Sequence, residues 1–155
     1  MSKSVKRVAR ALEEVGSAAK LQEIGAARTA QMAADLMGCT LDQIAKSIIF
    51  RGDASGAAIL FITAGGNQVD AGKASALAGE VLGKADAALI RAQTGFAIGG
   101  VAPVGHLVPP RAFFDPRLLE FGEVWAAGGT PRHVFGIDPQ ELLRLSGAEL
   151  ATFTA

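Results

Sequence analysis

Two short apolar runs on either side of a glycine-containing turn place the strongest constraint on the fold of this chain. The first run is Ser47–Phe50 and the second is Ala58–Thr63, and both are rich in β-branched and aromatic residues. Gly52–Gly56 lies between them and has the composition of a tight turn. The pattern predicts a hairpin of two buried strands. Such a hairpin favours a mixed or antiparallel sheet over a doubly wound parallel one.

Cap residues mark where the surrounding helices begin and end. Apolar residues at helical spacing, from Val5 to Val15, predict an amphipathic helix that stops at Gly16. Each further helix is predicted to begin at a residue whose side chain can accept a hydrogen bond from the first turn. These helices are expected from Thr29 to Met37, Thr40 to Gln43, Asp70 to Ala78 and Asp86 to Gly95, then after Asp115, and from Asp138 to Gly147.

Further strands are predicted between these helices. A second hairpin is expected from residues 124–126 and 133–136, which flank Gly128 and Gly129. Short strands are expected at Leu21–Ile24 and within the tail 149–155. The interleaved helices and strands therefore predict a single α+β domain over residues 1–155, in which helices surround the sheet.

The length and composition are those of one cytoplasmic domain. The chain has 155 residues, of which 50% are hydrophobic, so it can bury a substantial core. Its longest apolar run, Ala57–Ala64, is far shorter than the roughly 20 residues that a membrane span needs. The first residues lack the long apolar segment of a secretory signal. The single cysteine, Cys39, cannot form an intrachain disulfide.

The charges limit the partners that the chain can bind. Fifteen Lys and Arg residues balance fifteen Asp and Glu residues, which argues against a broad grip on a long duplex. The charge balance is compatible with a small local phosphate site. With two histidines and one cysteine the chain also lacks a ligand set for zinc, so we expect no metal.

The segment Thr94–His106 is the strongest candidate site. It holds four glycines and Pro103 after a predicted helix, and glycines allow backbone N–H groups to approach a ligand. The segment lacks the Gly-Lys-Ser/Thr end of a Walker A loop and the spacing of a Rossmann fingerprint. It therefore predicts either a backbone anion site or a tight crossover between elements.

A few side chains could carry chemistry. Lys46 precedes the first apolar run, where its ammonium could hold a phosphate or a developing oxyanion, or could be an ordinary solvated charge. His106 and His133 could each act as a general base or be structural. Cys39 follows a helix end, where the dipole raises the pKa of a thiol and disfavours a nucleophilic role. Trp125 is expected in the core.

Five segments, in order, resemble one known family. They are Leu41–Phe50, Asp70–Lys73, Thr94–Gly105, Trp125–Phe135 and Asp138–Leu142. In this order the chain is similar to the YbaK/prolyl-tRNA-synthetase editing-domain family of free-standing aminoacyl-tRNA deacylases, over about Leu21 to Gly147. The resemblance implies a mixed, largely antiparallel sheet curled into an open barrel with helices around it.

The resemblance also implies an activity. It is the hydrolysis, in trans, of the ester that joins a wrong amino acid to the terminal ribose of a tRNA. Small amino acids on tRNA(Pro) are the expected substrates, with prolyl-tRNA synthetase as a further partner. Such an ester is already activated, so a positioned water or the vicinal hydroxyl can attack it, and no metal or organic cofactor is implied. The alternative is a non-catalytic module of the same fold that binds tRNA ends or a nucleotide, or that partners a synthetase.

The resemblance finally assigns roles to residues. Lys46 matches the family's lysine at the mouth of the pocket, and Gly99–Pro103 matches a loop expected to receive the terminal adenosine. The implied catalytic residues are Lys46, Gly100 and His133, and the implied substrate-binding residues are Thr29, Gly99, Val101, Pro103 and His106. Backbone N–H groups of residues 99–101 are expected to contact the ester carbonyl.

Overall fold

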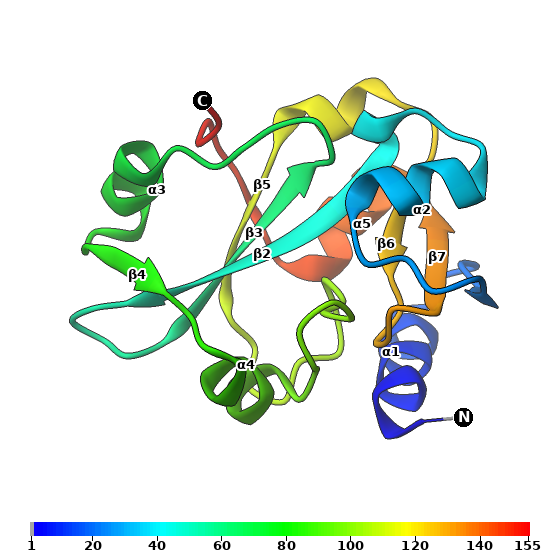
Figure 1. Cartoon of the computed structure of the whole chain (residues 1–155), viewed down its shortest axis with the longest axis horizontal. Coiled ribbons are helices and arrows are strands. Elements are labelled where there is room, and N and C mark those ends of the chain that lie inside the picture. The colour runs from blue at the N-terminus through cyan, green and yellow to red at the C-terminus, as the bar shows by residue number, and fades with distance from the viewer. Residues whose placement is uncertain (1) are drawn as a thin grey trace.

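A computed structural model describes residues 2–155. Figure 1 shows helices arranged around a bent sheet whose long strands β2 and β3 cross the middle of the molecule. The strands are β1 (Leu21–Glu23), β2 (Ile44–Gly52), β3 (Ala58–Ala64), β4 (Leu82–Lys84), β5 (Arg111–Phe114), β6 (Val124–Ala127), β7 (His133–Ile137) and β8 (Glu149–Leu150). The helices are α1 (Lys3–Glu14), α2 (Ala30–Met37), α3 (Ala71–Ala78), α4 (Ala87–Thr94) and α5 (Pro139–Ser146), with 3-10 turns η1 (Leu41–Gln43) and η2 (Pro116–Glu120).

The helices begin and end where the cap residues predict. An N-cap side chain accepts a hydrogen bond from the first turn of each of four helices, and a glycine in the left-handed conformation follows each of them. The caps are Thr29, Asp70, Asp86 and Asp138, and the glycines are Gly38, Gly79, Gly95 and Gly147. These four predicted helices are therefore confirmed. The first predicted helix corresponds to α1, and the short helices predicted at Thr40–Gln43 and after Asp115 form the 3-10 turns η1 and η2.

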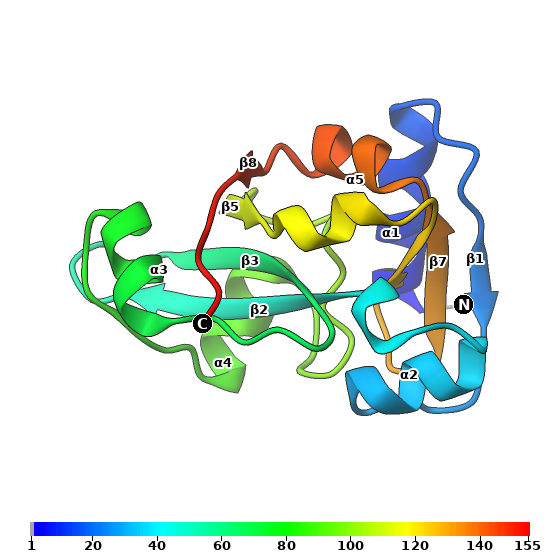
Figure 2. The same ribbon diagram turned by 90° about the horizontal axis from the view of Figure 1, so that it is seen from above.

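The sheet is mixed, as predicted. The strand order is β1-β7-β6-β2-β3-β5-β8, and β4 pairs with the C-terminal end of β2. The two predicted hairpins, β2–β3 and β6–β7, are antiparallel, as are β1–β7 and β2–β4. The pairs β2–β6, β3–β5 and β5–β8 are parallel. Figure 2 shows β7 running across the direction of β2, so the sheet bends strongly between its two halves.

Two strands, β4 and β5, were not predicted, and the strand in the C-terminal tail is shorter than expected. β4 has only three residues, and β5 has four between two proline-containing turns, so neither carries a readable alternation. Of the tail 149–155, only Glu149–Leu150 forms a strand, and Thr154 adds a single bridge to Val69. In the part of the chain that the structure describes, no helix is long and apolar enough to cross a membrane.

The core has three parts, and β2 contacts all of them. The main cluster packs α1, α5 and the segment 96–104 against one face of the sheet. A second cluster is centred on Phe61, whose ring lies 5.2 Å from Phe113 and 5.0 Å from Phe153. A small third cluster packs α2 against Ile44 and Trp125. Trp125, expected in the core, is only half-buried at the edge of this cluster.

Candidate functional site

A cavity of about 260 Å³ opens where α2, β2 and the β6–β7 hairpin meet the glycine-rich segment. The β6–β7 hairpin is far from α2 and β2 in the chain, and the parallel pairing of Ile44 with Trp125 brings it beside them. Five of the predicted site residues line this cavity: Thr29, Lys46, Gly99, Val101 and His133. Three others, Gly100, Pro103 and His106, do not.

Lys46 is the third residue of β2 and lies opposite Thr63 of β3. Its Nζ donates a hydrogen bond to the Gly65 carbonyl oxygen at 3.1 Å. Burial lowers the pKa of Lys46, while the negative charges of Asp42 and Asp115 oppose this shift. An ammonium has three N–H donors, so two stay available for a ligand.

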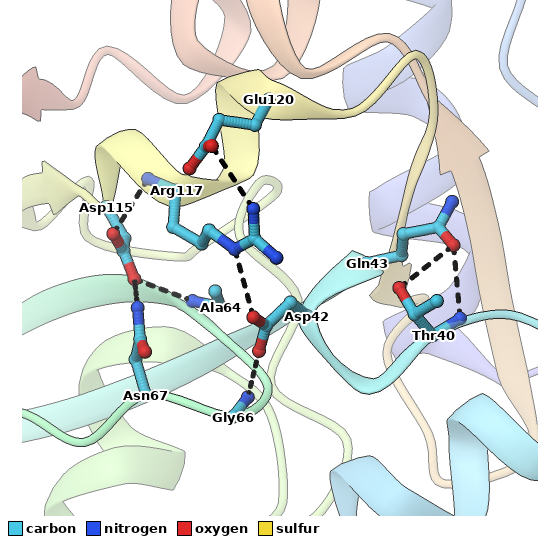
Figure 3. Close-up of polar contacts among 9 residues, drawn as sticks. All are labelled: Thr40, Asp42, Gln43, Ala64, Gly66, Asn67, Asp115, Arg117 and Glu120. Atoms are coloured by element: carbon cyan, nitrogen blue, oxygen red, sulfur yellow. Dashed lines mark hydrogen bonds and ion pairs between the residues drawn. The ribbon is translucent and has the colours of Figure 1, made fainter.

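The turn that holds the Lys46 ammonium is itself fixed by two carboxylates (Figure 3). Asp42 accepts the N–H of Gly66 at 2.8 Å, and Asp115 accepts the N–H of Ala64 at 3.1 Å. The Gly65 carbonyl therefore lies between two anchored backbone groups.

His133 begins β7, and one ring nitrogen is anchored. Its Nδ1 lies 2.6 Å from Thr130 Oγ1, and the tautomer decides which of the two donates. The same hydroxyl oxygen accepts the N–H of Arg132 at 3.1 Å. Among residues 2–155, no side chain or backbone group is hydrogen-bonded to Nε2. The arrangement fixes the imidazole and leaves one nitrogen for a ligand.

Gly100 has a different role from the one predicted. Its N–H donates to the Ala97 carbonyl at 3.1 Å, so this group is already engaged and the predicted contact with the ester carbonyl is not supported. A Cβ at Gly100 would lie 2.6 Å from Thr130 Cα and 2.9 Å from the Gly129 carbonyl oxygen. The glycine is therefore required where the segment packs on the β6–β7 turn. Within residues 2–155, the N–H groups of the neighbouring Gly99 and Val101 have no acceptor.

Pro103 and His106, which were expected to contact the substrate, lie outside this cavity. They line a separate hollow between α1 and α5. The His106 ring packs edge-on against Phe96, and its Nε2 lies 2.6 Å from the Ala102 carbonyl oxygen. Burial lowers the pKa of His106, the hydrogen bond to Ala102 opposes the shift, and the charge of Arg7 adds to it. His106 is thus placed as a structural histidine.

Cys39 lies outside the cavity wall. It packs against the small cluster beneath α2. Burial is the main cause that raises the pKa of its thiol, its own backbone opposes this, and the charge of Glu123 adds to the rise. In residues 2–155, no three side chains from His, Cys, Asp and Glu gather to hold a metal ion.

The residues that the sequence did not assign to this cavity include Arg28, Thr130 and Trp125. Arg28 is exposed directly before the cap of α2, Thr130 precedes the strand of His133, and Trp125 walls the cavity instead of filling the core. The spacing of three residues between Thr130 and His133, within a turn, is a signal that could have indicated the pair. Nothing near Arg28 in the sequence indicates its place.

The sequence and fold of this chain are similar to those of known proteins. The sequence model of the aminoacyl-tRNA editing domain matches residues 25–145. The chain belongs to the aminoacyl-tRNA editing domain family. The resemblance to editing domains drawn from the sequence is therefore confirmed, and so is the predicted fold.

Several individual proteins are similar to this member of the family. "Uncharacterized protein YwhH" of Bacillus subtilis (strain 168) is 33% identical over 118 residues, which are 76% of this chain and 74% of that protein. A crystal structure described as "a putative trans-editing enzyme for prolyl tRNA synthetase" is 46% identical, with a TM-score of 0.92 over 100% of this chain and 99% of that one. The structure of "hypothetical protein APE2540" is 26% identical, with a TM-score of 0.88 over 96% of this chain and 99% of that one.

Proposed function

We propose that this editing domain hydrolyses mischarged aminoacyl-tRNA in trans, with small amino acids on tRNA(Pro) as its substrates. The observation that carries the proposal is the meeting in one cavity of Lys46, His133, Gly99 and Val101, the last two of which have N–H groups without an acceptor in residues 2–155. The 46% identity to a structure described as "a putative trans-editing enzyme for prolyl tRNA synthetase" supports the choice of tRNA, and makes that synthetase a candidate partner.

The cavity offers hydrogen-bond donors and no strong nucleophile of its own. The ester that links an amino acid to the terminal ribose is already activated, so the attacking group is a water or the vicinal hydroxyl. Lys46 would bind the terminal phosphate or stabilise the oxyanion that forms at the ester carbon. Of the three backbone N–H groups expected to contact that oxygen, those of Gly99 and Val101 would serve as its donors, because the N–H of Gly100 is bonded to Ala97.

The remaining wall residues would hold the substrate in place. His133 presents its free Nε2 to the ester or to the attacking hydroxyl, either as a donor or as a base. Thr29 Oγ1 accepts the N–H of Met32 at 3.1 Å to cap α2, and its hydroxyl proton is still available to donate to the substrate. The apolar part of the wall, which includes several alanines, would receive the side chain of the amino acid and discriminate by size.

The test is the release of free amino acid from a panel of charged tRNAs, which includes alanyl-, cysteinyl- and seryl-tRNA(Pro). Lys46→Ala should reduce turnover by about 10²–10³, the usual loss when one preorganised charge contact is removed. The matched control is Lys84→Ala, because Lys84 is an exposed lysine at the end of β4 and outside the cavity. It should turn over at the wild-type rate.

The same assay separates the alternative. A non-catalytic module would bind the aminoacyl end or a nucleotide and release no amino acid from any tRNA. Equal turnover by wild type and Lys46→Ala would contradict the assigned site, even if the protein proves to be a deacylase.

A further inference from the structure

The turn after β3 contributes nothing to the cavity wall, and yet it holds the group that we place at the centre of the chemistry. Its Gly65 carbonyl accepts the Lys46 ammonium at 3.1 Å. Gly65 is buried against η1, where a Cβ would overlap the Leu41 carbonyl oxygen. The turn therefore packs directly on the residues that precede β2.

Asp42 of η1 fixes one side of this turn. Its Oδ1 accepts the N–H of Gly66 at 2.8 Å, and its Oδ2 accepts Nε–H of Arg117 at 3.0 Å (Figure 3). Arg117 also pairs with Glu120 at 3.2 Å, so Asp42 is itself held in place.

Asp115 fixes the other side from the end of β5. It is only 2% exposed, and its Oδ2 accepts both the N–H of Ala64 at 3.1 Å and the amide of Asn67 at 2.9 Å. Its Oδ1 accepts the N–H of Arg117 at 2.9 Å. A buried carboxylate with three donors is a rigid anchor, because leaving any of these groups unpaired is costly.

We propose that Asp42 and Asp115 are positioning residues that fix the Gly65 carbonyl and thereby aim the Lys46 ammonium into the cavity. The inference rests on the proposed deacylase role of Lys46. β2 places the backbone of Lys46, but its four-carbon side chain leaves the ammonium free to move. An acceptor held from two sides removes that freedom. A misplacement of about 1 Å in a catalytic group can cost about 10²-fold in rate.

The two carboxylates also act on Lys46 through their charge. Burial lowers the pKa of Lys46, and the charges of Asp42 and Asp115 oppose that shift. The other charged or titratable groups on the same cavity wall are Arg28 and His133. Removing one carboxylate charge therefore lowers the pKa of Lys46 further, so the ammonium loses its proton at a lower pH.

The experiment uses Asp42→Ala and Asp42→Asn in the full chain. The alanine removes both the anchor and the charge, whereas the asparagine can still accept the Gly66 N–H with its one carbonyl oxygen but loses the charge and the hydrogen bond from Arg117. We expect turnover to fall by about 10- to 100-fold in Asp42→Ala and by less in Asp42→Asn. In both variants the alkaline limb of the rate profile should move to lower pH. The pKa of Lys46, measured by NMR on isotopically labelled lysine, should fall in parallel.

The control is Asp138→Ala, which removes an N-cap of α5 and leaves the turn untouched. It should lower the melting temperature without moving the pKa of Lys46. Two results would overturn the proposal. One is that the turnover of Asp42→Ala falls only as much as its folded fraction does, and the other is that the pKa of Lys46 equals that of the wild type in both variants. Should Asp42→Ala fail to fold, Asp42→Asn decides by its turnover per folded molecule together with the pKa of Lys46. A wild type without deacylase activity defeats the proposed function, whereas the NMR spectrum of the Lys46 ammonium, compared between the wild type and the Asp42 variants, still tests whether its position depends on Asp42.

Discussion

Gly100 gives the sharpest test of how the cavity is built. Its Cβ position lies 2.6 Å from Thr130 Cα and 2.9 Å from Thr130 N, both of them backbone atoms that cannot rotate away. Gly100→Ala must therefore push the glycine-rich segment off the β6–β7 turn. Inserting one methyl group into a packed contact of this kind costs about 1–3 kcal/mol. For a chain of this size that lowers the melting temperature by roughly 2–12 °C.

The same displacement should reduce activity, because both of the separated pieces line the cavity. Gly99 and Val101 come from the glycine-rich segment, and Thr130 and His133 come from the β6–β7 hairpin. Thermal unfolding and single-turnover deacylation would be measured on the same preparations. Gly122→Ala is the control, because nothing lies within 4 Å of a Cβ there. If Gly100→Ala melts together with Gly122→Ala, the packing argument is refuted.

Two further predictions concern the histidines. Thr130→Val keeps the shape of Thr130 but removes the hydroxyl beside His133, so kcat/KM should fall roughly fivefold, equivalent to about 1 kcal/mol. Thr130→Ser should stay near the wild type, and equal kcat/KM values for the two variants would contradict an orienting role. Burial lowers the pKa of His106 in the folded protein. The stability that His106 contributes is therefore present above its ordinary pKa of about 6.5 and is lost as the pH falls toward its pKa in the folded state. Chemical denaturation from pH 7.5 to pH 5 should therefore show a flatter dependence in His106→Gln than in the wild type, and parallel curves would contradict this placement.

Much of the fold could be predicted because its signals are local. A cap residue acts within its own first turn, so Asp70 and Asp86 mark helix starts without knowledge of the tertiary structure. The hairpins were likewise readable from neighbouring runs. β5 could not be predicted, since its four residues become a strand only by pairing in parallel with β3, about fifty residues earlier in the chain.

The candidate site shows the same division. Lys46 and Gly99 were indicated by motifs, but the cavity around them depends on β2 pairing with β6, a contact that no local pattern specifies. Trp125 is a large apolar residue and was assigned to the core, yet this pairing leaves it at the cavity wall. His106 stands a few residues after Gly99 and Gly100, and proximity in sequence suggested a shared site. The chain turns at Pro103, and the histidine lies on the other side of the segment.

Lys46→Arg tests whether the cavity needs a compact charge or any positive charge. The Lys46 ammonium reaches the Gly65 carbonyl while the carboxylates of Asp42 and Asp115 act on it through their charge. A guanidinium is longer and planar, and it prefers paired contacts with a carboxylate. Arginine at this position should therefore turn toward Asp42 or Asp115 and present fewer donors to the cavity. We expect Lys46→Arg to exceed Lys46→Ala in deacylation and to stay about tenfold below the wild type, with its fold intact. Steady-state kinetics together with a melting curve would measure both. Wild-type turnover in Lys46→Arg would show that the site responds to charge alone and that the held position of the ammonium has no part in the reaction.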